Sequence, residues 1–288
     1  MREYVIMTDS CCDFSADMVR ELDLTVLPLS FYMEGQELFN YPDNREMDPK
    51  EFYAKLRGGA LGTTSAVSAG VFQAKMAQIA ADVKDILCIA FSSGLSATYQ
   101  SACIAAKAVM QEHGEAKIIV VDSLAASLGQ GLLVYLTVQE KRQGKTLEEA
   151  AAFAERTRSR ICHWFTVDDL NHLKRGGRIS AAAAMVGTML QMKPVLHVDD
   201  EGHLINVEKV RGRKASVNAL LDKMDGLAED PSVVFISHGD CEEEAAALGK
   251  AIQEKYQVEK LYINYVGPVI GNHSGPGTLA LFFQGRHR

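Results

Sequence analysis

Short apolar runs alternate with helix-like segments through the first half of the chain. Strands are predicted over 4–7, 86–91 and 118–121, where apolar residues follow one another without a polar break. Helices are predicted over 48–58, 68–84, 96–112, 128–143 and 146–160. Because buried strands separated by helices form parallel sheets, we expect a mainly parallel α/β domain over residues 1–160.

The second half has a different rhythm. After a predicted strand over 163–167 and a polar loop over 171–178, two β-like runs flank Asp199-Asp200-Glu201-Gly202, which is typical of a hairpin turn. The remaining predicted elements are an alanine-rich helix over 181–192, helices over 214–227 and 242–256, and strands over 233–237 and 260–266. We expect a second α/β domain with a mixed sheet over residues 161–288, and a ligand cleft between the two domains.

Hydroxyl side chains cluster where the predicted strands of the first half end. Thr8-Asp9-Ser10, the run 92–99 and Asp122-Ser123 each follow an apolar run, and Thr63-Thr64-Ser65 precedes a predicted helix. Ligands of parallel sheets bind at the carboxyl ends of the strands, so these hydroxyls are expected to face one cleft. Helix N-termini beside them attract negative charge, which indicates a small anionic group on the ligand.

Composition and charge narrow the function. The chain has 288 residues and a net charge of -7, and an acidic protein lacks the basic face that nucleic-acid binding requires. Its six cysteines form no C-x-x-C pair, so neither a zinc site nor a redox motif is indicated. The first residues lead directly into a strand, and no apolar stretch reaches the roughly 18 residues of a membrane-spanning helix. We therefore expect a cytoplasmic protein with no integral membrane segment.

Several segments, in order along the whole chain, resemble the DegV family of bacterial fatty-acid-binding proteins. They are Thr8-Asp9-Ser10 with Cys12-Asp13, Thr64-Ser65 with Ser68, the run 92–99, Val121-Asp122-Ser123, 173–179, Lys193-Pro194, 209–214 and 271–277. The resemblance implies a long-chain fatty acid held between two α/β domains, with its carboxylate on threonine and serine hydroxyls. It also implies a carrier without a cofactor, which is not itself an enzyme and which presents the acid to a separate fatty acid kinase. The sequence differs from the family pattern at Ala66-Val67, where glutamine and proline are usual, and at Ala97, where glycine is usual.

The candidate ligands of the carboxylate are hydroxyls and one histidine. They are Thr63, Thr64, Ser65, Ser93 and His273. Helix capping is the alternative explanation for Thr64 and Ser65. His273 lies in a segment with three glycines and a proline, and the resemblance implies that it joins the hydrogen-bond network of the carboxylate. Asp9 would repel a bound carboxylate, so we expect it to order its loop through backbone N–H groups.

Arginines form a second candidate group. Arg178, Arg211 and Arg213 lie in glycine-containing segments of an acidic protein, and a guanidinium fork suits phosphate. The resemblance implies that Arg178 and Arg211 lie near the site of phosphoryl transfer or contact the partner kinase. A solvated basic patch is the alternative.

Two other functions are consistent with parts of the sequence. An α/β-class serine hydrolase would use Ser96 or Ser93 with Asp240 and His273, although Thr98 occupies the position of the second elbow glycine. A kinase acting alone would need a phosphate-binding loop, and the chain has no G-x-x-x-x-G-K-[ST] motif. Gly129-Gln130-Gly131 lacks the third glycine of a dinucleotide loop, so no nicotinamide cofactor is expected. The predicted 181–192 helix is either a core helix or the wall of a lipid tunnel.

Overall fold

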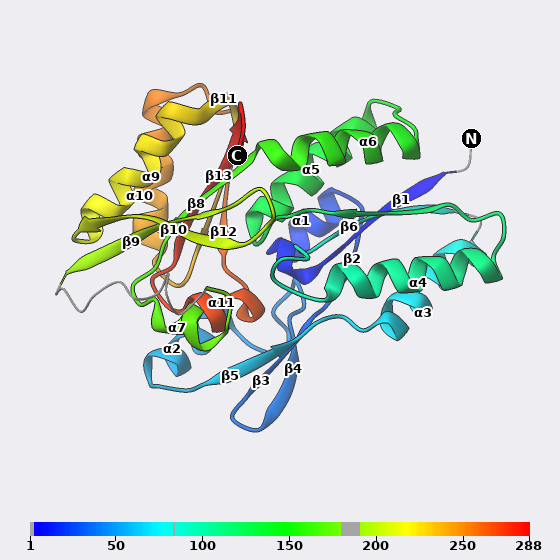
Figure 1. Cartoon of the computed structure of the whole chain (residues 1–288), viewed down its shortest axis with the longest axis horizontal. Coiled ribbons are helices and arrows are strands. Elements are labelled where there is room, and N and C mark those ends of the chain that lie inside the picture. Colours follow the sequence, from blue (N-terminus) through cyan, green and yellow to red (C-terminus); the bar gives the residue numbers. More distant parts are fainter. Residues whose placement is uncertain (1–2, 83, 180–190) are drawn as a thin grey trace.

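Three β-sheets organise the protein in the computed structural model, which describes residues 3–82, 84–179 and 191–288. A four-stranded sheet has the order β2-β1-β6-β7, a six-stranded sheet has the order β10-β9-β8-β13-β11-β12, and a small sheet has the order β4-β3-β5. The first half of the chain builds the four-stranded and the small sheet, and the second half builds the six-stranded sheet (Figure 1).

The four-stranded sheet is entirely parallel, which confirms the prediction for the first half. Its strands are β1 (Tyr4–Asp9), β2 (Leu24–Leu27), β6 (Asp85–Ala90) and β7 (Ile118–Asp122). Alternate residues of these strands face opposite sides: Cys88 packs with the helices of one face and Leu87 with those of the other. The two layers are α3 (Ala69–Ala81) with α4 (Thr98–Glu112), and α5 (Leu128–Arg142) with α6 (Leu147–Thr157).

The six-stranded sheet is mixed, as predicted. Its strands are β8 (Ile161–Thr166), β9 (Met192–Val198), β10 (Leu204–Arg211), β11 (Ala228–His238), β12 (Lys260–Tyr265) and β13 (Leu279–Gly285). The predicted hairpin is confirmed, because β9 and β10 pair antiparallel. Helices α9 (Arg213–Leu227) and α10 (Glu242–Lys255) cover one face of this sheet, and α5 packs against the other. Helix α5 thus contributes to the cores of both halves.

The structure differs from the predictions at five places. Thr63-Thr64-Ser65 belongs to strand β5 (Gly62–Ser65), which pairs antiparallel with β3 (Ser30–Met33), beside β4 (Gln36–Phe39). The polar loop after β8 contains a short helix, α7 (Asn171–Arg175), and the glycine-rich segment near the C-terminus contains α11 (Pro268–Ser274). The last apolar run, not predicted as a strand, forms β13 between β8 and β11. Met192, expected at the end of a helix, instead begins β9, and Gln191 before it lies in a turn. The other residues of that predicted helix, 181–190, lie outside the described residues.

Smaller elements complete the first half: the turns η1 (Ser10–Cys12) and η2 (Arg158–Arg160), and the helices α1 (Ala16–Glu21) and α2 (Pro49–Arg57). The predicted domain boundary after residue 160 coincides with the junction of η2 and β8 and stays a prediction. The two halves are joined by direct contacts. Tyr53 Oη donates to the carbonyl of Val266 at 2.7 Å, and Asn264 Nδ2 donates to the carbonyl of Asp13 at 2.8 Å. Within the described ranges, every helix is too short or too polar to span a lipid bilayer.

Candidate functional site

A cavity of about 260 Å³ lies where the two halves of the chain meet. Most of its wall is apolar. The larger apolar side chains on it are Leu29, Phe91, Leu95, Phe165, Leu173, Val198, Leu204, Val266, Val269, Ile270 and Phe282. They come from both halves: three lie in loops of the first half, and four lie on strands of the six-stranded sheet, so the packing of the two halves forms the cavity. A narrow, mostly apolar cavity with a few polar groups suits a ligand with one polar end.

Thr64 and His273 form a polar pair on this wall. Thr64 lies on β5 opposite Phe31, and the alternation of the strand turns Thr64 inward while Thr63 and Ser65 are mostly exposed. His273 lies in the last turn of α11, which packs against β5. Thr64 Oγ1 is 2.8 Å from His273 Nε2, a hydrogen-bond distance.

Burial sets the charge of His273. Loss of water around the ring, followed by the positive charge of Arg178, lowers the pKa of His273 to about 4. The imidazole is therefore neutral at neutral pH. Its Nδ1 side packs over Gly176, where an added Cβ would lie 2.1 Å from Nδ1. The ring is thus held between the Thr64 hydroxyl and a backbone position that admits no side chain.

Ser65, Ser96 and Arg178 also line the cavity. Ser96 Oγ lies 2.9 Å from Thr98 Oγ1 and accepts the backbone N–H of Thr98 at 3.2 Å, which fixes its position at the start of α4. The Arg178 guanidinium donates to the carbonyl of Gly176 and keeps further N–H groups for other acceptors. An anion here would meet neutral donors and one cation.

Comparison with known proteins decides the family. The family model described as "Uncharacterised protein, DegV family" matches residues 3–286 of this chain. A DegV domain-containing protein of Clostridium perfringens is 43% identical over 287 residues, which are 99% of this chain and 98% of that protein. The chain belongs to the DegV family.

Solved structures agree with this membership. A DegV family protein from Thermus thermophilus, whose structure is described as fatty-acid-binding, superimposes with a TM-score of 0.88 at 32% identity, over 99% of this chain and 100% of that chain. DegV of Bacillus subtilis, described as a fatty-acid-binding protein, superimposes with a TM-score of 0.83 at 29% identity, over 98% and 99% of the two chains. The α/β fold predicted from the sequence is therefore the DegV fold.

The structure brings some predicted site residues of this DegV family member together and separates others. Thr64, Ser65 and His273 lie on the cavity wall, as does Arg178, whereas Thr63 is exposed and lies off it. Ser93 is not part of the wall either: its backbone N–H donates to Asp122 Oδ1 at 3.1 Å, and Ser96 lines the cavity instead. The sequence signal for Ser96 was its place in the same hydroxyl cluster.

Asp9 has the role predicted for it. Its carboxylate accepts the backbone N–H groups of Cys11 at 3.0 Å and Phe91 at 2.7 Å, and so joins the loops after β1 and β6. Burial raises the pKa of Asp9 to about 6, although these hydrogen bonds oppose the shift. Asp9 thus orders the loops and is not on the cavity wall.

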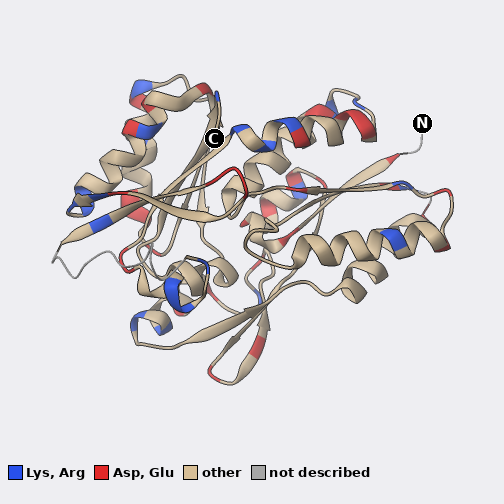
Figure 2. Ribbon diagram, viewed as in Figure 1, with Lys and Arg blue, Asp and Glu red and all other residues tan. Residues whose placement is uncertain are grey.

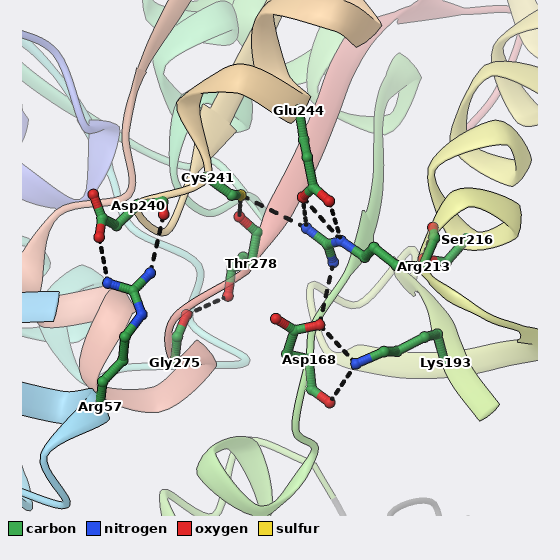
Figure 3. Close-up of polar contacts among 10 residues, drawn as sticks. All are labelled: Arg57, Asp168, Lys193, Arg213, Ser216, Asp240, Cys241, Glu244, Gly275 and Thr278. Carbon is green, nitrogen blue, oxygen red and sulfur yellow. Dashed lines mark hydrogen bonds and ion pairs between the residues drawn. The ribbon is translucent and has the colours of Figure 1, made fainter. Parts of the chain in front are cut away.

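Arg213 is engaged elsewhere (Figure 3). Its guanidinium forms a bidentate ion pair with Glu244, through Nε and Nη2, with Nη2 2.6 Å from Oε2. Its Nη1 lies 3.9 Å from Asp168 Oδ1. Lys193 Nζ binds the same Asp168 oxygen at 2.7 Å. Because two carboxylates already hold Arg213, its predicted contact with phosphate or a partner kinase is not supported. As the first residue of α9, Arg213 joins this helix to Glu244 of α10 and to Asp168, which follows β8 of the six-stranded sheet.

Arg211 is exposed at the last position of β10, opposite Met192. Met192 precedes Lys193, whose ion pair with Asp168 fixes this end of β9 beside the segment that leads into α7. Arg211 and α7 therefore lie toward the same end of the six-stranded sheet. Arg211 does not line the cavity, unlike Arg178.

The serine hydrolase alternative finds no support. His273 Nε2 faces Thr64, not a serine. Asp240, the expected acid of the triad, forms an ion pair with Arg57 of α2 (Figure 3). The three side chains of the proposed triad are thus engaged in separate interactions.

Proposed function

We propose that this protein binds one long-chain fatty acid in the cavity between its halves, with the carboxylate at the Thr64–His273 pair. The observation that carries the proposal is the combination of a mostly apolar cavity with a neutral hydroxyl–imidazole pair beside Arg178. The Thermus thermophilus and Bacillus subtilis relatives, both described as fatty-acid-binding, support the same ligand class.

The polar end suits a carboxylate. Its two oxygens accept hydrogen bonds without donating any, and Thr64, Ser65 and Ser96 all carry hydroxyl donors. A neutral His273 can turn either ring nitrogen into a donor by its choice of tautomer, and among the described residues of this wall Arg178 supplies the full positive charge. Neutral donors hold an anion less tightly than a buried ion pair, which suits a protein that must release its ligand.

The apolar wall suits the acyl chain. Each methylene removed from water contributes about 0.8 kcal/mol, so affinity should grow steeply with chain length until the cavity is full. The same wall gives no reason for binding a short or multiply charged acid. We therefore assign the protein a binding role and no catalytic one.

The test is stabilisation of delipidated protein by acids of different length. Stearate should raise the melting temperature through linkage, and octanoate at the same concentration should do little. Stearate methyl ester should stabilise less than stearate, because it lacks the charged head. Equal effects of the long and short acids would mean that only a carboxylate is recognised, and no effect of stearate would refute the proposal.

We further propose that the bound acid is presented to a separate kinase, which docks at the end of the protein that carries Arg211 and α7. Lysines and arginines gather on α2 and α7, and Arg211 ends β10 nearby, although the chain is acidic as a whole (Figure 2). This basic surface lies beside the polar end of the cavity, since Arg178 follows α7 and lines the wall. An acidic face on the kinase would complement it.

Replacement of Arg211 distinguishes kinase docking from ligand binding. Arg211→Ala should leave the bound acid in place and strongly reduce its phosphorylation by the kinase. Arg286→Ala is the matched control, because Arg286 is also exposed but follows β13 at the opposite end of the same sheet. Normal phosphorylation of the Arg211→Ala protein would exclude this docking surface without affecting the proposed ligand.

A further inference from the structure

Helix α11 carries His273 in its last turn, so the position of the imidazole depends on how the two ends of this helix are held. The first end is tied to both halves of the chain. Asp13 Oδ1 accepts the backbone N–H of Gly267, the N-cap of α11, at 3.1 Å. Asp13 Oδ2 lies 2.5 Å from Ser127 Oγ, which is 2.9 Å from Ser237 Oγ on the six-stranded sheet. The other end of α11, next to His273, has a separate support.

Helix α7 supports this second end (Figure 1). The two helices pack together, and His172 and Gly176 lie four residues apart, on the same face of α7. Gly176 lies against the His273 ring, and the His172 ring lies on Gly275, where an added Cβ would be 2.5 Å from Cδ2. Gly275 is the C-cap of α11 and has a φ of 81°, a conformation that favours glycine. The turn after α11 therefore offers a bare backbone surface on which the His172 ring packs directly.

A second side chain presses on the same turn. Asp168, which precedes α7, lies over Gly277, where an added Cβ would be 2.0 Å from Oδ2. The ion pair with Lys193 holds this carboxylate in place (Figure 3). The segment that begins at Asp168 and ends with α7 thus contacts the last turn of α11 and the residues after it at three points.

Arg175 holds the His172 ring from the solvent side. Its Nη2 lies 2.9 Å from His172 Nδ1. Because a guanidinium can only donate, Nδ1 accepts, and the neutral ring carries its proton on Nε2. Burial, followed by the positive charge of Arg175, lowers the pKa of His172, which keeps the ring neutral. Neither residue belongs to the described part of the cavity wall, so both lie outside the site that they approach through Gly275.

We propose that Arg175 and His172 are positioning residues of the carboxylate site. Arg175 orients the His172 ring, the ring supports the turn at Gly275, and the turn keeps His273 Nε2 beside Thr64. The inference rests on the proposed function and refines it, because it names what sets the geometry of the head-group pair. Arg175 is also exposed on α7, within the basic surface proposed for kinase docking. An acidic group of the partner that bound Arg175 would compete with His172 for it, which links docking to the hold on the carboxylate.

The test is calorimetric titration of delipidated Arg175→Ala protein with stearate and with stearate methyl ester. Loss of the contact that orients His172 should weaken stearate binding about fivefold, as expected for one hydrogen bond. The ester lacks the charged head and depends mainly on the apolar wall, so its affinity should change less than about twofold. Equal losses for the acid and the ester would mean that Arg175 has a general structural role, and would overturn the proposal.

Lys174→Ala is the matched control. It removes the same charge from the same exposed helix and leaves the contact between Arg175 and His172 in place. Its affinity for stearate should stay within about twofold of that of the unchanged protein, because an isolated surface charge contributes little. If Lys174→Ala loses as much affinity as Arg175→Ala, only the charge of the surface matters and the positioning role is refuted.

His172→Phe completes a double-mutant cycle. The phenyl ring still packs on Gly275 but accepts no hydrogen bond from Arg175, so this variant should lose about as much stearate affinity as Arg175→Ala. The double variant should lose no more than either single variant. Losses that add, or full affinity in either single variant, would contradict the chain of contacts. If stearate fails to bind the unchanged protein, the proposed function fails instead, so the two failures are distinguishable.

Discussion

Thr64 Oγ1 and His273 Nε2 lie 2.8 Å apart although 209 positions separate them in the chain. One belongs to the small sheet of the first half and the other to a short helix of the second half. The pair exists only while the two halves are packed together. A ligand that binds at this pair should therefore stabilise the packing of the two halves against each other.

Thr64→Val tests the pair with little change of volume. It removes the hydroxyl that lies against His273, and the loss of one hydrogen bond to a charged acceptor should weaken stearate binding about tenfold. Thr63→Val is the control, since Thr63 is the exposed neighbour on the same strand and lies off the cavity wall. Calorimetric titration measures both. Equal affinity of the two variants would remove Thr64 from the site.

Gly176→Ala tests how the imidazole is positioned. The new methyl group would lie 2.1 Å from His273 Nδ1, so the ring must move and its contact with Thr64 must lengthen. We expect a loss of stearate affinity of about tenfold in a protein that still folds. Gly226→Ala on α9 is the control, because its added Cβ would meet no atom within 4 Å. If Gly176→Ala retains full affinity, the ring position does not depend on this glycine.

His273→Gln tests the acid sensitivity of the ligand-free protein. The pKa of His273 is about 4 in the folded protein and about 6.5 when unfolded, so the unfolded chain binds the extra proton first. The stability that this residue contributes is present above about pH 6.5 and is lost as the pH falls toward 4, by at most about 3 kcal/mol. The variant has no titrating imidazole at this position. Its free energy of unfolding, measured by urea titration, should therefore fall less than that of the unchanged protein between pH 6.5 and pH 4. An identical fall in both proteins would contradict the buried, neutral state.

Asp13→Asn tests the carboxyl group behind Ser127. Its pKa is about 8 in the folded protein, so its contribution to stability is full below the unfolded value of 3.8 and is lost as the pH rises toward 8. Asparagine can donate to Ser127 and accept from Gly267 as the protonated acid does, and it tolerates the left-handed backbone at φ 51°. The variant should gain at least about 1 kcal/mol over the unchanged protein near pH 8, and less near pH 5. A variant that is less stable at both values would show that Asp13 is ionised.

Local patterns predicted most of the elements and the identity of the family. The parallel strands have continuous apolar runs, and the capping box at Thr146 is formed as predicted. The predictions failed where tertiary packing decided the outcome. β5 has hydroxyls at three of its four positions and becomes a strand because β3 pairs with it. Helix α11 forms in a glycine-rich segment, with Gly271 inside it, because it packs on β5 and α7.

The candidate site was predictable only where its residues carried a local sequence signal. Thr64 and His273 carried signals of their own, a hydroxyl cluster and an unusual glycine-rich setting. Ser237 ends a predicted strand and Ser127 precedes a predicted helix, but only the packing of α5 over the six-stranded sheet brings them together at 2.9 Å. The role of Arg213 could not be read from its motif, because Glu244, its main partner, lies 31 residues further along the chain.

Mass spectrometry of the purified protein, first intact under native conditions and then after denaturation, tests the central claim most directly. We expect a native mass that exceeds the chain by one long-chain acid, which denaturation releases, and a Thr64→Val, His273→Gln double variant that carries much less of it. A native mass equal to that of the chain alone, both as purified and after incubation with stearate, would contradict the proposed fatty-acid binding.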